Sequence, residues 1–199
     1  MSCLLRRKLS NYLLDNGITL NNYRDSHNWK ENKSIMKSTS IITILELEAN
    51  AYPFLEDFLF EAIYVPEGSP PLNKSIIFQP DLYCYIKDFG RKHDLGFIIE
   101  ANKKPVGAIW TRLFSEEQKG YGFIDNETPE LSMAINTDFR NQGLGTQLLE
   151  KMILKLQELS YKKVSLSVDK RNFASQLYLK FEFQKHQMDG NTVVMVKVL

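Results

Sequence analysis

The chain has 199 residues, of which 43% are hydrophobic and 25% are charged, and its formal net charge is +1 at pH 7. This size is typical of one well-packed domain and is short for two. The near-neutral charge, without a large cluster of lysines or arginines, argues against a nucleic-acid partner. No run approaches the roughly 18 apolar residues of a membrane span, and no signal peptide is recognisable, so we expect a soluble cytoplasmic protein without a membrane partner.

The residues that usually bind metals are few and scattered. The chain has two cysteines, Cys3 and Cys84, and three histidines, and none of them follows the spacing of a zinc site or of a disulfide framework. We therefore expect no metal, and the cysteine usage fits a reducing compartment.

Residues 1–39 differ in composition from the rest of the chain. Apolar residues between Leu4 and Leu13 form one face of a predicted short helix that ends at Gly17, whereas residues 21–40 are rich in Asn, Ser and Lys. We predict an N-terminal extension over residues 1–39, which is mobile or docks on the domain or on a partner subunit, and one domain over residues 40–199.

From residue 41 the patterning predicts elements in the order β, α, α, β, β, β, α, β, α, β, β. The first half consists of a β-branched strand over 41–47, a helix capped by Asn50 with Pro53 in its first turn, and a second helix over 81–89. Two strand-like runs, 95–100 and 106–114, then form a predicted antiparallel hairpin.

The second half begins with an alternating run at 131–136, followed by a glycine-bearing turn and a long helix. The apolar face of that helix comprises Leu144, Leu148, Leu149, Met152, Ile153, Leu156 and Leu159. Alternation at 164–169 predicts a half-exposed strand that is parallel to its predecessor. The final hairpin, 183–188 and 192–199, turns at Asp189-Gly190.

The turn before the long helix is suited to bind phosphate. It comprises Arg140, Asn141, Gln142, Gly143, Leu144, Gly145 and Thr146. Glycines let the backbone approach an oxyanion, the first amides of the helix point at it, and Arg140 can add a bidentate contact. The Rossmann and P-loop motifs both fail, because position 148 is Leu and no Lys precedes Thr146. The alternative is a structural turn whose glycines serve packing.

Arg140, Gly143 and Gly145 match the pyrophosphate-binding motif of the GCN5-related N-acetyltransferases (GNAT), and the order of elements is similar to that fold. The stretch from Asn172 to Phe183 resembles the family's second motif. It departs from it at Ser175, where Ala is usual, and at Glu182, where Gly is usual. Glu182 must therefore accept a left-handed conformation, or the turn differs.

The resemblance implies a mixed α/β fold. Its sheet is twisted and mostly antiparallel, with one splayed parallel pair and helices on both faces. It also implies an acetyl-CoA-dependent N-acetyltransferase that works through a ternary complex, with a small-molecule or peptide amine as acceptor. The implied cofactor contacts are the 140–146 turn, the backbone at Met133, Ala134 and Ile135, and Asn172, whose alternative role is helix capping.

Two residues are candidates for proton transfer in such a reaction. Glu130 resembles the family's strand-borne base, and its alternative role is that of a solvated loop carboxylate. Tyr178 takes the place of the family's tyrosine beside the sulfur of CoA and would protonate the departing thiolate. Its alternative role is core packing.

Two other classes of function stay open, a non-catalytic sensor or scaffold that binds acyl-CoA and an interaction domain whose glycine turn is purely structural. The sequence does not determine the acceptor or the oligomeric state, and it is compatible with a homodimer. The polar and aromatic candidates for acceptor contacts are Tyr83, Arg91, Trp110, Arg112, Tyr121, Phe123 and Asp125.

Overall fold

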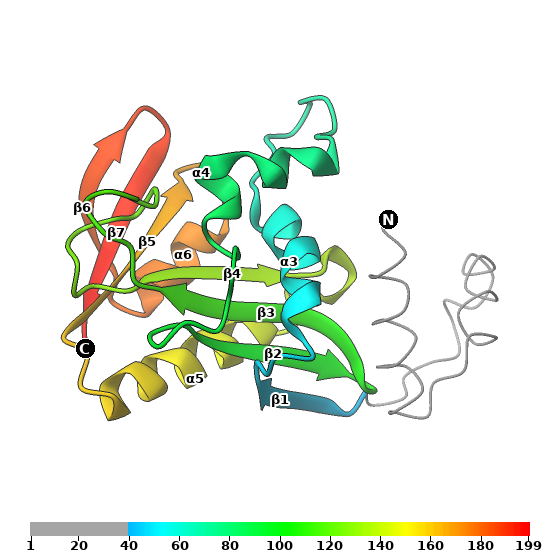
Figure 1. The fold of residues 1–199 in the computed structure, drawn as a ribbon. Helices are drawn as coiled ribbons and strands as arrows, with labels where there is room; N and C mark the ends of the chain where they lie inside the picture. The colour runs from blue at the N-terminus through cyan, green and yellow to red at the C-terminus, as the bar shows by residue number, and fades with distance from the viewer. Residues whose placement is uncertain (1–39) are drawn as a thin grey trace. The chain divides into compact units, whose positions relative to one another are not determined.

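The computed structural model describes residues 40–199, so the short helix and the extension predicted for residues 1–39 lie outside it. The described residues form a seven-stranded sheet in the order β1-β2-β3-β4-β5-β7-β6 (Figure 1). Its strands are β1 Ile42–Glu46, β2 Leu95–Ala101, β3 Lys104–Arg112, β4 Glu130–Ile135, β5 Lys163–Asp169, β6 Gln184–Asp189 and β7 Thr192–Val198. All neighbouring strands pair antiparallel except β4 and β5, which confirms the predicted mixed sheet.

Helices cover both faces of the sheet. α5 Leu144–Glu158 and α6 Ala174–Lys180 belong to one apolar cluster, and α3 Leu55–Ala62 belongs to a second cluster on the opposite face. The short helix α4 Pro80–Tyr83 and the segment after it pack into this second cluster. Three 3-10 helices occur in the described chain, η2 Tyr52–Phe54, η3 Lys74–Phe78 and η4 Thr137–Phe139. Among residues 40–199, no helix has both the length and the apolar composition needed to cross a bilayer.

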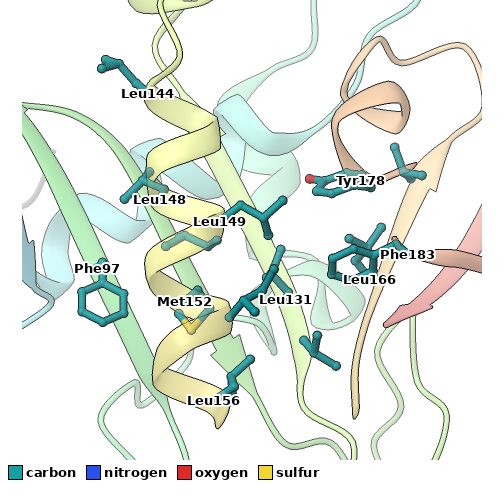
Figure 2. Packing of buried hydrophobic residues seen from close by; sticks show 14 of the residues in the cluster. Phe97, Leu131, Leu144, Leu148, Leu149, Met152, Leu156, Leu166, Tyr178 and Phe183 are labelled. Carbon is teal, nitrogen blue, oxygen red and sulfur yellow. The ribbon is translucent and has the colours of Figure 1, made fainter. Parts of the chain in front are cut away.

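The apolar face predicted for α5 is the centre of the first cluster (Figure 2). Leu148, Leu149, Met152 and Leu156 are fully buried against the sheet. Leu159 is the exception, because it lies beyond the last residue of the helix and is 48% exposed. Alternation in the strands supplies the other half of this core, since every second residue of β2, β4 and β5 points toward α5.

Two predicted helix boundaries are wrong. Asn50 does not cap a helix: a turn closed by the hydrogen bond from Ala51 N to Glu48 O precedes η2, which runs into α3 without a side-chain cap. The helix predicted over 81–89 is regular only over Pro80–Tyr83 and continues as turns. The Arg112 side chain binds the carbonyls of Cys84 and Lys87, and tertiary contacts of this kind override helix propensity.

The end of α6 resolves the question raised by Glu182. Its φ is +63°, so it takes the left-handed conformation in which glycine is usual. Phe183 N donates to Tyr178 O and Glu182 N donates to Leu179 O, which is the hydrogen-bond pattern of a Schellman motif. The last hairpin turns at Gly190-Asn191, one residue later than predicted, because Asp189 still pairs with Thr192.

Candidate active site at the diverging strands

β4 and β5 begin side by side and then run apart (Figure 1). Their register contains a single pair, Glu130 with Ser165, and Ser165 N donates to Pro129 O at 3.0 Å. Asn136 N donates to Val106 O, so by alternation the even-numbered residues of β4 pair with β3 and the odd-numbered ones face the gap toward β5. The N–H groups of Met133 and Ile135 and the carbonyl of Met133 therefore face the gap, where an extended ligand can bind as an added strand, while the carbonyl of Ile135 accepts from Arg140.

This alternation separates the three β4 residues predicted to contact a cofactor. The backbones of Met133 and Ile135 face the gap, as the prediction requires, whereas the backbone of Ala134 pairs with β3 and its side chain is buried toward α3. Contact between this strand and a cofactor stays a prediction, and in this geometry Met133 and Ile135 would make it.

The N-terminus of α5 opens at the same gap. Its N-cap is Gly143, with φ +79°, and no side chain caps the helix. Arg140, Asn141, Gln142 and Thr146 are exposed, so the turn presents the first backbone amides of the helix to solvent. Uncapped amides at the positive end of a helix dipole form an anion site, and the predicted diphosphate position has this geometry.

Gly145 tests the alternative in which the glycines serve only packing. A Cβ at this position would lie 3.6 Å from Leu177 and from Met133, which is ordinary van der Waals contact. The folded chain therefore has space for a side chain at Gly145. Gly143, by contrast, needs its glycine for the positive φ. The absence of a side chain at Gly145 keeps the helix entrance open next to Met133.

The Arg140 side chain is engaged within the protein. Nε donates to Ile135 O at 2.9 Å, and Nη2 forms an ion pair with Glu61 of α3 at 2.7 Å. Thr137 Oγ1 donates to the same Glu61 oxygen. Arg140 thus joins α3, the last residue of β4 and the turn, and its predicted bidentate contact to phosphate would require exchange of the Glu61 partner.

Asn172 caps α6. Its Oδ1 accepts a hydrogen bond from Ala174 N at 2.9 Å, which is the capping alternative of the two roles considered. This contact occupies the side-chain oxygen, and the amide Nδ2 is the group through which the predicted cofactor contact would be made.

Glu130 is a buried strand residue and not a solvated loop carboxylate. It begins β4 and is 2% exposed, and its Oε1 accepts hydrogen bonds from Tyr85 Oη at 2.7 Å and from Gly122 N at 2.8 Å. Burial raises the pKa of Glu130 to about 7, although the two hydrogen bonds act in the opposite direction. A carboxylate with a pKa in this range can accept a proton near neutral pH.

Tyr178 lies on the opposite face of the sheet, in the α5 cluster. Its ring packs edge-on against Phe183, and Figure 2 shows the hydroxyl directed from α6 toward α5. Burial raises the pKa of Tyr178 to about 12, so the phenol stays protonated at neutral pH. Packing and proton donation remain compatible, because the ring fills the core while the phenol keeps its proton at neutral pH.

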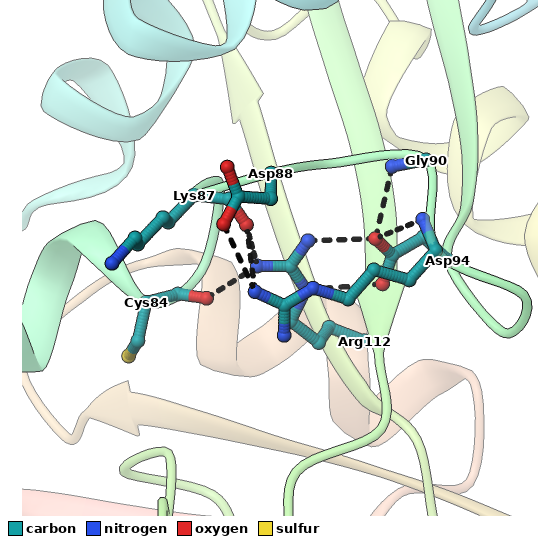
Figure 3. A network of polar contacts seen from close by, with 7 residues as sticks. Cys84, Lys87, Asp88, Gly90, Asp94 and Arg112 are labelled. Atoms are coloured by element: carbon teal, nitrogen blue, oxygen red, sulfur yellow. Dashed lines mark hydrogen bonds and ion pairs between the residues drawn. The ribbon is translucent and has the colours of Figure 1, made fainter.

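Arg112, considered above as an acceptor contact, has a structural role. Its guanidinium forms a bidentate ion pair with Asp94, with both side chains 2% exposed, and Nη1 donates to Cys84 O and Lys87 O (Figure 3). Phe89 lies 5.5 Å from the guanidinium carbon. Asp94 also accepts from Gly90 N and Arg91 N. This network fixes the segment after α4, which carries Tyr85.

Sequence reasoning missed Tyr85, Gly120 and Gly122. Tyr85 lies within an apolar run, where an aromatic residue is interpreted as core, and the two glycines lie in residues 115–129, whose composition is typical of a polar connection. Residues 115–129 also pack against β5, since a Cβ on Gly122 would lie 2.8 Å from the Leu166 carbonyl carbon. Ser165 is therefore buried, and β5 is less exposed than predicted. No signal in the sequence links these positions to Glu130.

In residues 40–199, no three His, Cys, Asp or Glu side chains gather as a metal site.

Comparisons with known proteins agree with this geometry. The family described as "Acetyltransferase (GNAT) family" matches residues 55–183. Among solved structures, a GNAT acetyltransferase from Streptococcus pneumoniae is 19% identical, with a TM-score of 0.57, covering 80% of this chain and 100% of that one. A PaiA N-acetyltransferase from Thermoplasma acidophilum, solved with coenzyme A, is 17% identical, with a TM-score of 0.60 and coverage of 80% and 99%.

A ribosomal-protein-alanine N-acetyltransferase from Escherichia coli is 19% identical, with a TM-score of 0.52, covering 78% of this chain and 91% of that one. A search of curated proteins finds no significant match. At these identities the structural neighbours establish the fold alone. The family match spans more than half of the chain and includes both the glycine turn and α6, and the chain therefore belongs to the GNAT family of acetyltransferases.

Proposed function

We propose that this protein transfers the acetyl group of acetyl-CoA to a primary amine of a small molecule, peptide or protein, within a ternary complex. The observation that carries the proposal is the gap between β4 and β5, with the uncapped amides of α5 at one end and the buried carboxylate of Glu130 beside the other. An extended thioester bound along Met133 and Ile135 would have its phosphates at the helix and its acyl group between the strands.

Each residue has a distinct task in this scheme. Glu130 takes the proton that the ammonium must lose before its nitrogen can attack, directly or through water. The nitrogen then forms a bond to the acyl carbon, the carbon–sulfur bond breaks, and the thiolate receives a proton from Tyr178. The nitrogen loses its second proton to solvent to give the amide, and Tyr178 recovers its proton from solvent. A direct transfer needs no protein nucleophile, and burial raises the pKa of the Cys84 thiol to about 11, which keeps it unreactive at neutral pH.

A charge in the first turn of α5 tests the cofactor site. We expect Thr146→Glu to weaken CoA binding by roughly 5- to 150-fold, since a carboxylate near a diphosphate costs roughly 1–3 kcal/mol in a partly solvated site. The fold should persist, because Thr146 is exposed and an acidic residue is favourable near a helix N-terminus. Isothermal titration with CoA measures the effect. Thr146→Gln, of the same size without charge, is the control, and equal affinities for the two variants would contradict the phosphate assignment.

Replacing Tyr178 with Phe tests the proposed acid. We expect kcat to fall about tenfold, a modest loss because a thiol of pKa about 8.5 leaves readily even without full protonation. The loss should shrink as pH rises, since the thiolate then needs the proton less. Leu179→Ala on the same helix is the matched control, because its side chain is 44% exposed. An unchanged kcat in Tyr178→Phe would leave this tyrosine with packing alone.

The acceptor is identified by measuring release of free CoA thiol across a library of amines. The library includes polyamines, aminoglycosides, amino acids, lysine peptides and peptide N-termini. The last group is included because one protein of the same fold is named as an alanine N-acetyltransferase. Saturable CoA binding without turnover on any amine would favour a non-catalytic acyl-CoA sensor instead, and failure to bind CoA would favour an interaction domain.

A further inference from the structure

We propose that Tyr85 is a positioning residue for Glu130: together with the N–H of Gly122 it fixes Oε1, which leaves Oε2 as the oxygen that takes the acceptor's proton. The inference rests on the proposed function and extends it to the atom. The Oε1 atom of Glu130 already accepts hydrogen bonds from Tyr85 Oη at 2.7 Å and from Gly122 N at 2.8 Å. These two donors use the acceptor capacity of that oxygen.

The Tyr85 hydroxyl has only one orientation available. It accepts a hydrogen bond from Tyr121 N at 2.6 Å, so its own proton is directed to Glu130. The ring is held edge-on against Phe114 with centroids 5.0 Å apart, and it stacks on Tyr121 at 6.4 Å. The Arg112 network fixes the backbone at Cys84, one residue before it. Both the ring and the proton of Tyr85 are therefore positioned before any substrate binds.

Oε2 is in the opposite situation. It is buried and has no hydrogen-bond partner among residues 40–199. A Cβ on Gly120 would lie 2.2 Å from Oε2 and 2.9 Å from Tyr85 Oη, so only a glycine at this position fits against the oxygen. Buried polar atoms without partners are uncommon in folded proteins, and an unpaired oxygen on the candidate base marks the place where a proton can bind.

Two further buried polar atoms lack partners on the same face of the sheet, again within the described residues. Ser165 is the register partner of Glu130 across the β4–β5 pair, and Trp110 is two positions from Arg112, which pairs with Glu130 on the other side. Ser165 Oγ and Trp110 Nε1 are both unpaired. Three such atoms lie on one face of the sheet, on residues at and beside the start of β4, and an amine or a water molecule that relays its proton could satisfy them.

Glu130 is the group in this environment that changes charge near neutral pH. The ionisable groups that face it are Cys84 and Tyr85 from the segment after α4, and Arg112 from β3, which is neutralised by Asp94. Burial raises the pKa values of Cys84 and Tyr85, and both stay neutral at pH 7. Residues 120–122, which cover Glu130, contribute two glycines and the neutral phenol of Tyr121.

The test is the titration of Glu130 in Tyr85→Phe, measured in two ways. The first is the pH profile of kcat/KM, and the second is the ¹³C NMR shift of the Glu130 carboxyl, assigned by comparison with Glu130→Gln. Since the Tyr85 hydrogen bond lowers the pKa of Glu130, its loss should move both midpoints upward by roughly one pH unit. Activity should recover substantially at high pH. Tyr161→Phe, which removes a hydroxyl hydrogen-bonded to His93 from a ring packed on the cluster of the opposite face, should leave both midpoints in place.

The two readouts separate this inference from the proposed function. An unmoved NMR midpoint in Tyr85→Phe overturns the role of Tyr85, whether or not the enzyme turns over. A raised NMR midpoint in a protein that acetylates no amine supports the Tyr85–Glu130 assignment and counts against acetyl transfer. If Tyr85→Phe does not fold, Gly120→Ala replaces it. A methyl group beside Oε2 should lower kcat at least tenfold at every pH, and unchanged turnover in that variant overturns the assignment of Oε2.

Discussion

Replacing Glu130 with Gln is expected to lower kcat/KM by roughly 10²–10⁴-fold, the usual contribution of a positioned general base. Gln has nearly the same shape and its side-chain oxygen can still accept from Tyr85 and Gly122, so CoA binding should persist. The variant should also lose the acidic limb of the pH profile, which we place near pH 7 because burial raises the pKa of Glu130 to about 7. Steady-state kinetics across pH 5.5–9 provide the measurement.

Glu127→Gln is the matched control, because Glu127 lies shortly before Glu130 in the chain and is exposed. It should leave kcat/KM unchanged. Comparable activity in Glu130→Gln and in wild type across the whole pH range would exclude Glu130 as the base. In that case the buried carboxylate of Glu130 would serve only to hold Gly122 against β5.

The same substitution has a consequence for stability, measured in the same experiment series. In the folded protein the pKa of Glu130 is raised from 4.5 to about 7, so folding takes up a proton in this interval. The resulting stabilisation is complete below about pH 4.5 and is lost as pH rises through 7. The melting temperature of wild type should therefore fall more steeply across this window than that of Glu130→Gln.

Replacing Arg112 with Leu is expected to destabilise the fold by about 3–5 kcal/mol, because Asp94 is then left charged, buried and without its ion partner. For a chain of this size the loss corresponds to a fall in Tm of roughly 10 °C. Activity should fall as well, since the segment that carries Tyr85 loses its attachment to β3. Thermal and chemical unfolding measure the stability.

Two further variants separate the buried charge from the lost contacts. Arg112→Leu combined with Asp94→Leu should recover part of the stability, since replacing a whole buried pair by apolar residues is often close to neutral. Arg91→Ala, which removes a largely exposed ion pair with Asp88 at 3.8 Å, should change stability by less than about 1 kcal/mol. A cost of similar size for Arg112→Leu would show that the network does not support the segment.

The order of elements and the mixed sheet could be predicted because strong periodicities determine them. Leu148, Met152 and Leu156 specify the buried face of α5, and alternation at Val164 and Leu166 specifies β5. The glycine turn before α5 could be located for the same reason, since it interrupts two regular patterns. The boundaries that were wrong, at Asn50 and in the segment after Tyr83, are decided by contacts with distant residues.

The partners of the candidate base could not be predicted. Tyr85 is 45 residues from Glu130 in sequence and is brought to it by the Arg112–Asp94 pair, which is itself a long-range contact. Gly120 and Gly122 are needed because the Glu130 carboxylate lies against them, and a sequence pattern carries no information about that contact. The predicted extension at residues 1–39 and its docking to a partner subunit stay predictions.

The single register pair between β4 and β5 also has a mechanical consequence. Hydrogen bonds alone would leave the sheet as two ribbons, β1 to β4 and β5 to β6, and the apolar cluster that α5 and α6 share spans the seam, with Leu131 on one side and Leu166 on the other. α5 thus presents the proposed anion-binding amides at its first turn and contributes its apolar side to the cluster that joins the two ribbons. A ligand that lies in the seam would hold the two ribbons together laterally, where hydrogen bonds between β4 and β5 stop.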